Sequence, residues 1–288
     1  MRKLTHGSLF TGVGMIDYGL HLAGWETSYQ VEVNEYCRAV LRKHRDLWPD
    51  AVLFDDVKAV GSRNLPKVDL ISGGFPCTDV SVAGVGLRRK GGKIDGIGTP
   101  DNPSERSGLW YQFHRIVHEL RPAWVLIENV ARLFHTGDGG RVVRAMESEG
   151  YACWPILLGT ECLGTPHERT RTWTVCRHVD AHRDRDLRGE VEVELRGDLP
   201  DNLRREIAEK SQHWSDWKRK LGTGNARPGG APEEPGFDAH SRGVRAVHGY
   251  PNWVDRIKCC GNSVVWVVPA AIGAWIARIQ EKAEAGAA

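Results

Sequence analysis

Residues 4–14 read Leu-Thr-His-Gly-Ser-Leu-Phe-Thr-Gly-Val-Gly, and this stretch decides the fold class. A short apolar strand pattern runs directly into a turn whose glycines let the backbone approach a ligand closely. Helical apolar spacing follows at 15–23. A strand, a glycine loop and a helix in this order are typical of a βαβ unit. The full dinucleotide pattern GxGxxG is absent, so a nucleotide-binding loop and a plain strand-to-helix turn both remain open.

The same alternation of strands and helices continues to about residue 175. Apolar or alternating runs that end at Gly, Pro or polar residues predict strands at 4–10, 27–33, 68–72, 124–128, 151–157 and 171–176. Helical spacing predicts helices at 15–23, 36–44, 109–120, 140–149 and 264–279. We therefore expect an α/β fold with a mostly parallel sheet, and we expect the last helix to pack back on it.

Composition limits the function classes. The chain has 288 residues, of which 41% are hydrophobic and 26% charged, which is typical of a globular protein. Its 39 basic and 37 acidic residues give a net charge of +2, so any basic surface must be local. No apolar run approaches the ~20 residues that span a bilayer, and the N-terminus lacks the pattern of a signal peptide. We therefore expect a cytoplasmic protein.

The cysteines argue for a working thiol rather than for a covalent framework. There are seven, an odd count without a secretory signal, and this argues against a disulfide framework. Cys176, His178 and His182 fit the spacing of no common zinc finger, so no metal is expected.

One cysteine stands out by its position. Cys77 follows Gly-Gly-Phe-Pro directly after the strand predicted at 68–72, at the sheet edge where such folds place their active sites. A loop at this edge can lower the pKa of a thiol and make it a nucleophile. The alternative is a buried, inert cysteine.

Two acidic residues also end predicted strands. Glu128, followed by Asn129 and Val130, could exchange a proton with a substrate ring beside the thiol, or could only cap the next turn. Glu32 lies about 20 residues after the glycine loop, where an acidic side chain can bind ribose hydroxyls. The alternative for Glu32 is a solvated carboxylate at the end of a strand.

Two further motifs lie later in the chain. Arg169 and Arg171 alternate into a predicted strand and so point to one face, where they could hold an anionic backbone or a carbonyl oxygen, or form surface salt bridges. Residues 261–264, Gly-Asn-Ser-Val, form a turn that could simply cap the last helix.

Taken together and in this order, the motifs resemble the C5-cytosine DNA methyltransferase family. The resemblance rests on 10–14, Pro76 with Cys77, 128–130, 169–171 and 261–264. It implies a Rossmann-like, S-adenosylmethionine-dependent methyltransferase domain with a smaller target-recognition domain. The catalytic and cofactor-binding domain would comprise 1–177 plus 256–288, and the target-recognition domain 178–255, where close alternation of Asp, Glu and Arg begins.

The resemblance also implies a mechanism without a metal. Cys77 would add to C6 of a flipped-out cytosine, so that C5 can attack the methyl group of S-adenosylmethionine. Glu128 would hold the N3 and N4 edge, Arg171 would bind the O2 side, and Arg169 would support the site. Loss of the C5 proton and elimination of Cys77 would release 5-methylcytosine.

The same resemblance assigns the cofactor site. Phe10 would lie against the adenine, the backbone at Gly12 and Gly14 near the methionine part, and Glu32 at the ribose. The remaining cofactor-binding positions would be Asp56, which takes the adenine amino group, together with Pro76, Leu109, Asn262 and Ser263. Three positions depart from the family pattern, which usually has Gln or Asn at Thr78, often Asp at Ser8 and often Gly at Met15.

DNA binding is expected from two segments. Residues 81–106, rich in Gly, Lys and Arg, would form a mobile loop over the flipped base, unless they are only a surface insertion. Residues 178–255 would read the base edges of double-stranded DNA. The expected setting is DNA methylation by a monomer in a bacterial or phage-infected cell, associated with the nucleoid and not with a membrane. A separately acting cognate restriction endonuclease, as in restriction-modification, is a candidate partner. The alternatives are an RNA (tRNA) C5-cytosine methyltransferase and a catalytically silent DNA-binding protein of the same fold.

Overall fold

The computed structural model describes residues 2–76, 108–135, 137–159, 169–179 and 263–285. In this part of the chain the strands form one seven-stranded sheet of order β3-β2-β1-β4-β5-β7-β6. All neighbours pair in parallel except β7, which is antiparallel to both β5 and β6. The strands are β1 (Thr5–Leu9), β2 (Glu26–Val31), β3 (Val52–Phe54), β4 (Leu70–Gly73), β5 (Trp124–Val130), β6 (Tyr151–Gly159) and β7 (Thr170–His178).

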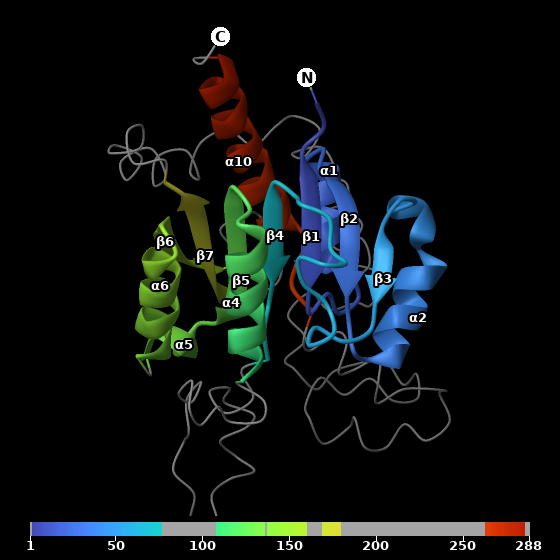
Figure 1. Ribbon diagram of the computed structural model, residues 1–288, viewed down its shortest axis with the longest axis horizontal. Coiled ribbons are helices and arrows are strands. Elements are labelled where there is room, and N and C mark those ends of the chain that lie inside the picture. The colour runs from blue at the N-terminus through green and yellow to red at the C-terminus, as the bar shows by residue number, and fades with distance from the viewer. Residues whose placement is uncertain (1, 77–107, 136, 160–168, 180–262, 286–288) are drawn as a thin grey trace, which may run out of the picture.

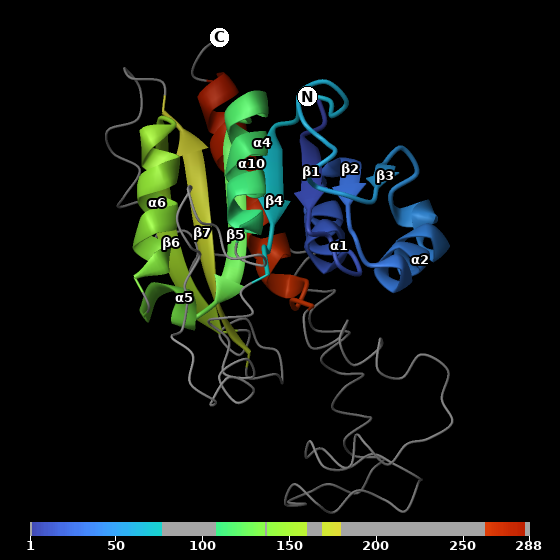
Figure 2. The ribbon, with the colours of Figure 1, turned by 60° about the horizontal axis from the view of Figure 1, so that its bottom comes forward.

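Helices cover both faces of this sheet (Figures 1 and 2). Side chains of α4 and α6 belong to the core on one face, and side chains of α1 and α10 to the core on the other. Among the described residues, no helix is both long and apolar enough to cross a membrane. The helices are α1 (Met15–Leu22), α2 (Glu35–Lys43), α4 (Leu109–Leu120), α5 (Arg132–His135), α6 (Asp138–Ser148) and α10 (Val267–Ala285), with a 3-10 turn at Arg45–Leu47.

Alternation along the central strand explains the two cores. In β5, Val125 and Ile127 pack with α4 and α6, whereas Trp124 and Leu126 pack with α1 and α10. Successive side chains of a strand point to opposite faces, so a strand buried on both sides is apolar throughout. This is why the stretch from 124 onward is a continuous apolar run that ends at Glu128.

The C-terminal helix packs on the first one, as its sequence predicts. Trp25 Nε1 donates a hydrogen bond of 3.0 Å to the carbonyl oxygen of Gly273 in α10. A Cβ at Gly19 in α1 would lie only 2.3 Å from the carbonyl oxygen of Trp266. The backbone of α1 at Gly19 therefore packs directly against the backbone at the start of α10, with no room for a side chain between them.

The predicted elements are confirmed apart from their ends and two short ones. The strand β3, which has three residues, and the helix α5, which has four, carry no periodic pattern long enough to be detected in the sequence. The helix α6 begins at Asp138, two residues before the predicted start, because Gly137 takes a left-handed conformation there.

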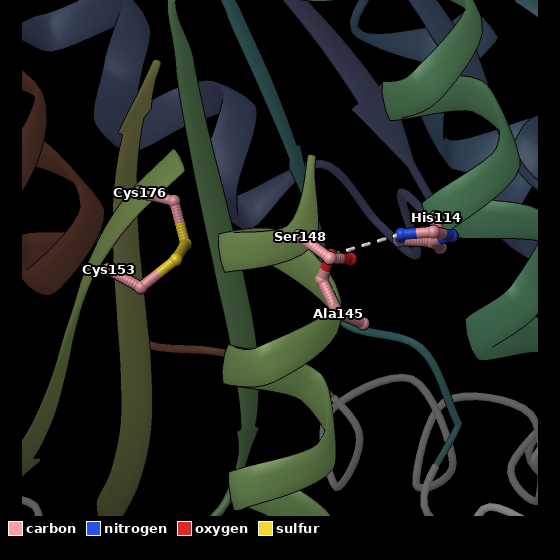
Figure 3. Close-up of a disulfide and its surroundings, with 5 residues drawn as sticks. All are labelled: His114, Ala145, Ser148, Cys153 and Cys176. Atoms are coloured by element: carbon pink, nitrogen blue, oxygen red, sulfur yellow. Dashed lines mark hydrogen bonds between the residues drawn. A yellow bond between two sulfur atoms is a disulfide. The ribbon is translucent and has the colours of Figure 1, made fainter. Parts of the chain in front are cut away.

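One expectation about the cysteines is wrong. Cys153 of β6 and Cys176 of β7 are joined by a disulfide (Figure 3). They are direct partners in the antiparallel register, with 4.1 Å between their Cα atoms. The number of cysteines could not predict this pair. The two sulfurs meet because of the antiparallel register of β6 and β7, which a residue count does not contain. Cys37 is buried and is not part of a disulfide.

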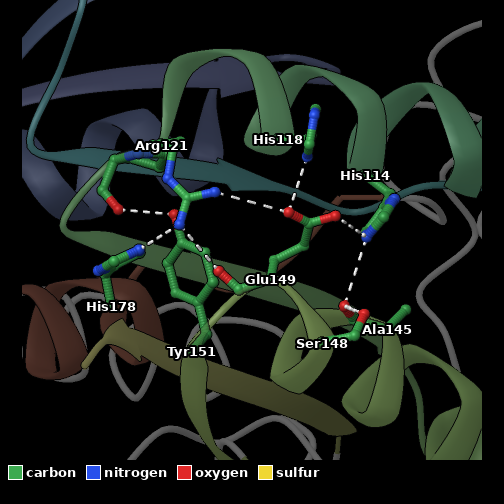
Figure 4. A network of polar contacts seen from close by, with 9 residues as sticks. His114, His118, Arg121, Ala145, Ser148, Glu149, Tyr151 and His178 are labelled. Atoms are coloured by element: carbon green, nitrogen blue, oxygen red, sulfur yellow. Dashed lines mark hydrogen bonds and ion pairs between the residues drawn. The ribbon is translucent and has the colours of Figure 1, made fainter. Parts of the chain in front are cut away.

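A polar network closes the edge of the sheet where β5 and β6 begin (Figure 4). The Glu149 carboxylate lies 2.7 Å from His118 Nδ1, and this hydrogen bond lowers the pKa of Glu149. Arg121 Nη2 donates to His178 Nε2 over 2.7 Å, and the Tyr151 hydroxyl donates to the Pro122 carbonyl oxygen. The network joins the ends of α4 and α6 to β6 and β7. It lies at the opposite end of β5 from Glu128.

The contact at Gly19 gives a stability prediction. Gly19→Ala adds a methyl group against backbone atoms of the segment leading into α10, and this clash exceeds the gain in helix propensity of about 1 kcal/mol. We expect a net loss of about 2 kcal/mol in the free energy of unfolding, measured by urea titration. His21→Ala, at an exposed position of the same helix, is the control. Wild-type stability in Gly19→Ala would show that α10 does not approach α1 this closely.

Candidate active site

The ends of several strands meet at one edge of the sheet. Leu9 at the end of β1 is the register partner of Gly73 in β4, and Gly73 is the partner of Ile127 in β5. Thr174 of the antiparallel β7 continues this row. The segments that follow β1, β4 and β5 therefore start side by side, next to the beginning of β7. The predicted convergence at the carboxyl edge is confirmed for these described strands.

Hydrogen bonds fix the loop after β1 against β2. The amide of Thr11 donates to the carbonyl oxygen of Val31 over 3.1 Å, and the amide of Gly14 donates to that of Thr11 over 3.1 Å. Phe10, Gly12 and Gly14 all have positive φ values, of 55°, 60° and 82°. Glycine adopts this conformation without strain, whereas Phe10 is held in it by its surroundings. The loop is thus a defined backbone turn.

Glu32 joins this loop to the segment after β2. Its Oε2 accepts a hydrogen bond of 2.7 Å from the amide of Gly12, and its Oε1 accepts one of 2.8 Å from the amide of Asn34. Each carboxylate oxygen keeps a further lone pair that a hydroxyl group could use. Arg38 Nη1 donates to the carbonyl oxygens of Glu32 and Val33, and so holds the backbone that carries the acid. Our sequence analysis missed Arg38, whose only signal is its place in the helix after Glu32.

Glu128 is a buried acid between a glycine and an arginine. Its Oε1 lies 3.3 Å from Arg171 Nε. A Cβ at Gly74 would lie 2.5 Å from its Oε2, so only a glycine leaves room for the carboxyl group. Burial raises the pKa of Glu128 to about 7, although Arg171 and Arg169 both act to lower it. The carboxyl group can therefore hold or release a proton near neutral pH.

Asn129 holds the loop that leads from β4 toward Cys77. Its Nδ2 donates a hydrogen bond of 3.2 Å to the carbonyl oxygen of Phe75. Its own carbonyl oxygen accepts one of 3.0 Å from the Thr172 hydroxyl in β7. The sequence pattern alone assigns Asn129 no role. The structure shows that it fixes residues 74–76 to the end of β5.

Arg169 connects the start of β7 to the segment before α10. Its Nη2 donates to the carbonyl oxygen of Ser263. Burial and the neighbouring Arg171 lower its pKa, whereas Glu128 raises it. The charges of both arginines act on the pKa of Glu128, and Arg171 is in direct contact with that carboxyl group.

The other predicted site residues are placed as follows. Asp56, exposed after β3, accepts a hydrogen bond of 2.8 Å on Oδ1 from the amide of Lys58, and Leu109 is the first residue of α4. Phe10 and Pro76 are half-buried beside the glycine loop and the β4 loop respectively. Cys77, Thr78, Asn262, 81–106 and 180–255 lie outside the described residues. Within the described part, no cluster of three or more His, Cys, Asp or Glu side chains could hold a metal ion.

The pKa of Glu128 predicts a pH-dependent effect of Glu128→Gln. The folded-state pKa of about 7 lies above the ordinary value of 4.5, so ionisation of this acid destabilises the folded protein as pH rises. Glutamine cannot ionise, and the variant should gain stability relative to wild type between pH 5 and 8, by up to about 3 kcal/mol. Urea unfolding at both pH values measures this.

Thr170→Ser, an exposed change without a titratable group, is the control and should follow the wild-type pH profile. If the difference in unfolding free energy between Glu128→Gln and wild type were the same at pH 5 and pH 8, the raised pKa of Glu128 would be refuted.

Comparisons with known proteins agree with this geometry. The chain is 34% identical over 171 residues to the type II methyltransferase M2.BsuMI of Bacillus subtilis, which covers 57% of this chain and 39% of that protein. It is 30% identical over 183 residues to the type II methyltransferase M.Bsp6I of a Bacillus species, covering 62% of this chain and 53% of that one. The chain thus spans about half the length, or less, of these curated relatives.

A crystal structure supports the fold. It is that of a prophage-encoded protein of E. coli described as a DNA modification methyltransferase. The two chains superpose with a TM-score of 0.56 over 97% of this chain and 100% of the other, at 17% sequence identity.

The family description of the C-5 cytosine-specific DNA methylases matches residues 4–223, which include the glycine loop, Glu32, Glu128 and both arginines. The chain therefore belongs to the C-5 cytosine-specific DNA methylase family.

Proposed function

We propose that this protein transfers a methyl group from S-adenosylmethionine to C5 of a cytosine that is flipped out of a specific duplex DNA sequence. The observation that carries the proposal is the buried Glu128 carboxyl, with a pKa of about 7, beside Arg171. It lies against Gly74, three residues before Cys77, so that a proton donor and a thiol can act on the same ring.

The proposed reaction uses the thiol and the acid together. The Cys77 thiolate forms a bond to C6, and the electron pair of the C5–C6 bond delocalises toward N3 and O2. Protonated Glu128 donates its proton at N3 and so offsets the developing charge. C5 then attacks the methyl group. The C5 proton is then lost to a solvent base, the Cys77 thiolate leaves C6, and the N3 proton returns to the Glu128 carboxylate, so that neutral 5-methylcytosine and S-adenosylhomocysteine are released.

The arginines would orient the base and balance charge. Arg171 can donate to O2 of the cytosine while it remains beside the Glu128 carboxyl, because a guanidinium group has five N–H donors. Arg169 donates a hydrogen bond to the carbonyl oxygen of Ser263. We therefore assign Arg169 to holding the C-terminal segment at the site, in agreement with its expected supporting role.

The edge of β1 and β2 fits S-adenosylmethionine, the methyl donor that this family uses. Glu32 is fixed by two backbone amides and has lone pairs left for ribose hydroxyls. The backbone of Gly12 and Gly14 would approach the methionine part, with Phe10 and Asp56 at the adenine. Pro76, Leu109, Asn262 and Ser263 would complete the cofactor site, and the bound cofactor would supply an electrophilic methyl group.

DNA is the proposed substrate because the family to which the chain belongs is described as C-5 cytosine-specific DNA methylases, and the curated relatives are named type II methyltransferases. That name favours DNA over tRNA and also favours a place in a restriction-modification system. We propose that 178–255 is the target-recognition domain, that 1–177 with 256–288 form the catalytic domain, and that 81–106 close over the base. The protein would act in the cytoplasm of a bacterial or phage-infected cell.

The thiol chemistry predicts the effect of Cys77→Ser. A hydroxyl group is a far weaker nucleophile at neutral pH, so methyl transfer from labelled S-adenosylmethionine to duplex DNA should fall by about a thousandfold or more. Duplex DNA with 5-fluorocytosine at target sites should trap wild type covalently, because fluorine cannot leave as the C5 proton does.

Cys37→Ser, which removes a thiol in α2 that forms no disulfide, is the control and should keep both methyl transfer and covalent trapping. Label found in tRNA but not in DNA would contradict the proposed substrate. A Cys77→Ser protein with full activity would contradict the mechanism.

The contact between Gly74 and Glu128 predicts a second loss. In Gly74→Ala the new methyl group would occupy the space of Glu128 Oε2, so the acid must move away from the base. We expect kcat to fall by about a hundredfold, while S-adenosylmethionine still binds, as measured by single-turnover methylation and calorimetry. Gly140→Ala is the control, since its Cβ would meet only the flexible end of Arg144. Wild-type kcat in Gly74→Ala would remove Glu128 from the proposed mechanism.

A further inference from the structure

A buried carboxyl group lies beneath the glycine loop, where the proposed chemistry gives it no role. Asp17, in the first turn of α1, has no exposed surface. Its Oδ2 accepts a hydrogen bond of 3.0 Å from the Ser8 hydroxyl, and its Oδ1 accepts one of 3.1 Å from Gln30 Nε2. Ser8 and Gln30 are themselves 1% and 4% exposed. All three side chains are thus shielded from water.

This cluster joins the three elements that surround the loop. Ser8 in β1 and Gln30 in β2 are direct partners in the parallel register, so both donate from neighbouring strands to one acid on α1. The chain between Ser8 and Asp17 contains the whole loop 10–14. The hydrogen bond between these two side chains therefore closes the loop at its base and sets the distance between its two ends.

Further hydrogen bonds hold the loop between Ser8 and Asp17 to the two strands. The Thr11 hydroxyl lies 3.3 Å from the Ser8 carbonyl oxygen and 3.2 Å from that of Val31. Gly14 then hydrogen-bonds to Thr11, and Gly12 to Glu32. Thr11 is held to β1 and β2, whereas Gly14 leads directly into α1, so a shift of α1 relative to β1 would distort 12–14, including the amide of Gly12 that donates to Glu32.

The buried acid is also costly for the fold. Both hydrogen-bond donors to Asp17 are neutral, and burial raises the pKa of Asp17 to about 6. An apolar side chain would fill such a place with less loss of stability. A destabilising group kept under a functional loop points to a role in shaping that loop.

We propose that Asp17 is the positioning residue of the cofactor loop, and that its hydrogen bonds to Ser8 and Gln30 hold residues 10–14 in the geometry that binds S-adenosylmethionine. The identity of the ligand rests on the proposed function, whereas the control of loop geometry does not. Asp17 acts through the backbone and does not touch the cofactor, so it is not a catalytic residue.

Cofactor binding and catalysis test this role separately. Asp17→Ala removes both hydrogen bonds to a charged acceptor, so the Kd and KM for S-adenosylmethionine should rise by about ten- to a hundredfold. The kcat at saturating cofactor and the affinity for duplex DNA should stay at their wild-type values. His21→Ala on the exposed side of α1 is the control and should leave all four quantities unchanged.

An exchange of the two partners separates positioning from general stability. Ser8→Asp alone places two acids in contact and should weaken cofactor binding further, whereas the exchange variant Ser8→Asp/Asp17→Ser restores one acid and one hydroxyl at 3.0 Å. The exchange variant should recover the Kd to within about threefold of wild type. A Kd for Asp17→Ala equal to wild type, or an exchange variant as weak as Asp17→Ala, would overturn the proposal.

Hydrogen exchange in the cofactor-free protein measures directly how well the backbone amides of the loop are protected. In Asp17→Ala the amides of Gly12 and Gly14 should exchange at least about tenfold faster, while the amides of α10 keep their protection. Unchanged exchange at both glycines would overturn the positioning role even if binding changed. Wild-type protein that protects these amides but binds no S-adenosylmethionine would refute the proposed function alone.

Discussion

The site depends on one register constraint, the row in which Leu9, Gly73 and Ile127 are hydrogen-bonded neighbours. A sheet that packs against a core on each face has little freedom to slip, because a shift of one residue would exchange the side chains that fill the two cores. The segments after β1, β4 and β5 therefore begin at the same level. This places the Glu128 carboxyl group against the backbone of Gly74. The antiparallel β7 completes the row by bringing Arg171 from the other direction.

The same edge carries two buried acids that oppose folding. Their pKa values rise from 4.5 to about 7 at Glu128 and from 3.8 to about 6 at Asp17. At neutral pH each shift corresponds to about 3 kcal/mol against the folded state, a large part of the 5–15 kcal/mol by which domains are stable. The two acids differ in their partners. Glu128 faces arginines and can exchange a proton with a ligand, whereas Asp17 is enclosed by neutral donors and can only hold backbone in place.

The sequence was sufficient to predict helices and strands whose apolar periodicity extends over many residues or ends at a clear boundary. The 109–120 helix and the strands that end at the glycine loop, Glu32 and Glu128 follow from local pattern, because apolar periodicity and the glycine turn are properties of neighbouring residues. Three contacts were not predictable in this way: the Cys153–Cys176 disulfide, the contact of Gly74 with Glu128, and the hydrogen bond from Arg38 to the carbonyl oxygen of Glu32. Each depends on the register or the side-chain direction between segments far apart in the chain, which local periodicity does not contain.

The C-terminal segment contacts Arg169 through its backbone, at the carbonyl oxygen of Ser263, to which Arg169 donates a hydrogen bond. Every residue type has a backbone carbonyl group, so this contact does not depend on which side chains are present at 261–264. What it requires is that α10 packs on α1 at Gly19, because only that packing brings Ser263 to the start of β7. Arg169, the last helix and the helix that carries Asp17 are thus linked by one hydrogen bond and by the packing at Gly19. A change in the packing of α10 would therefore act on the acid and on the glycine loop together, although α10 itself supplies no group to either.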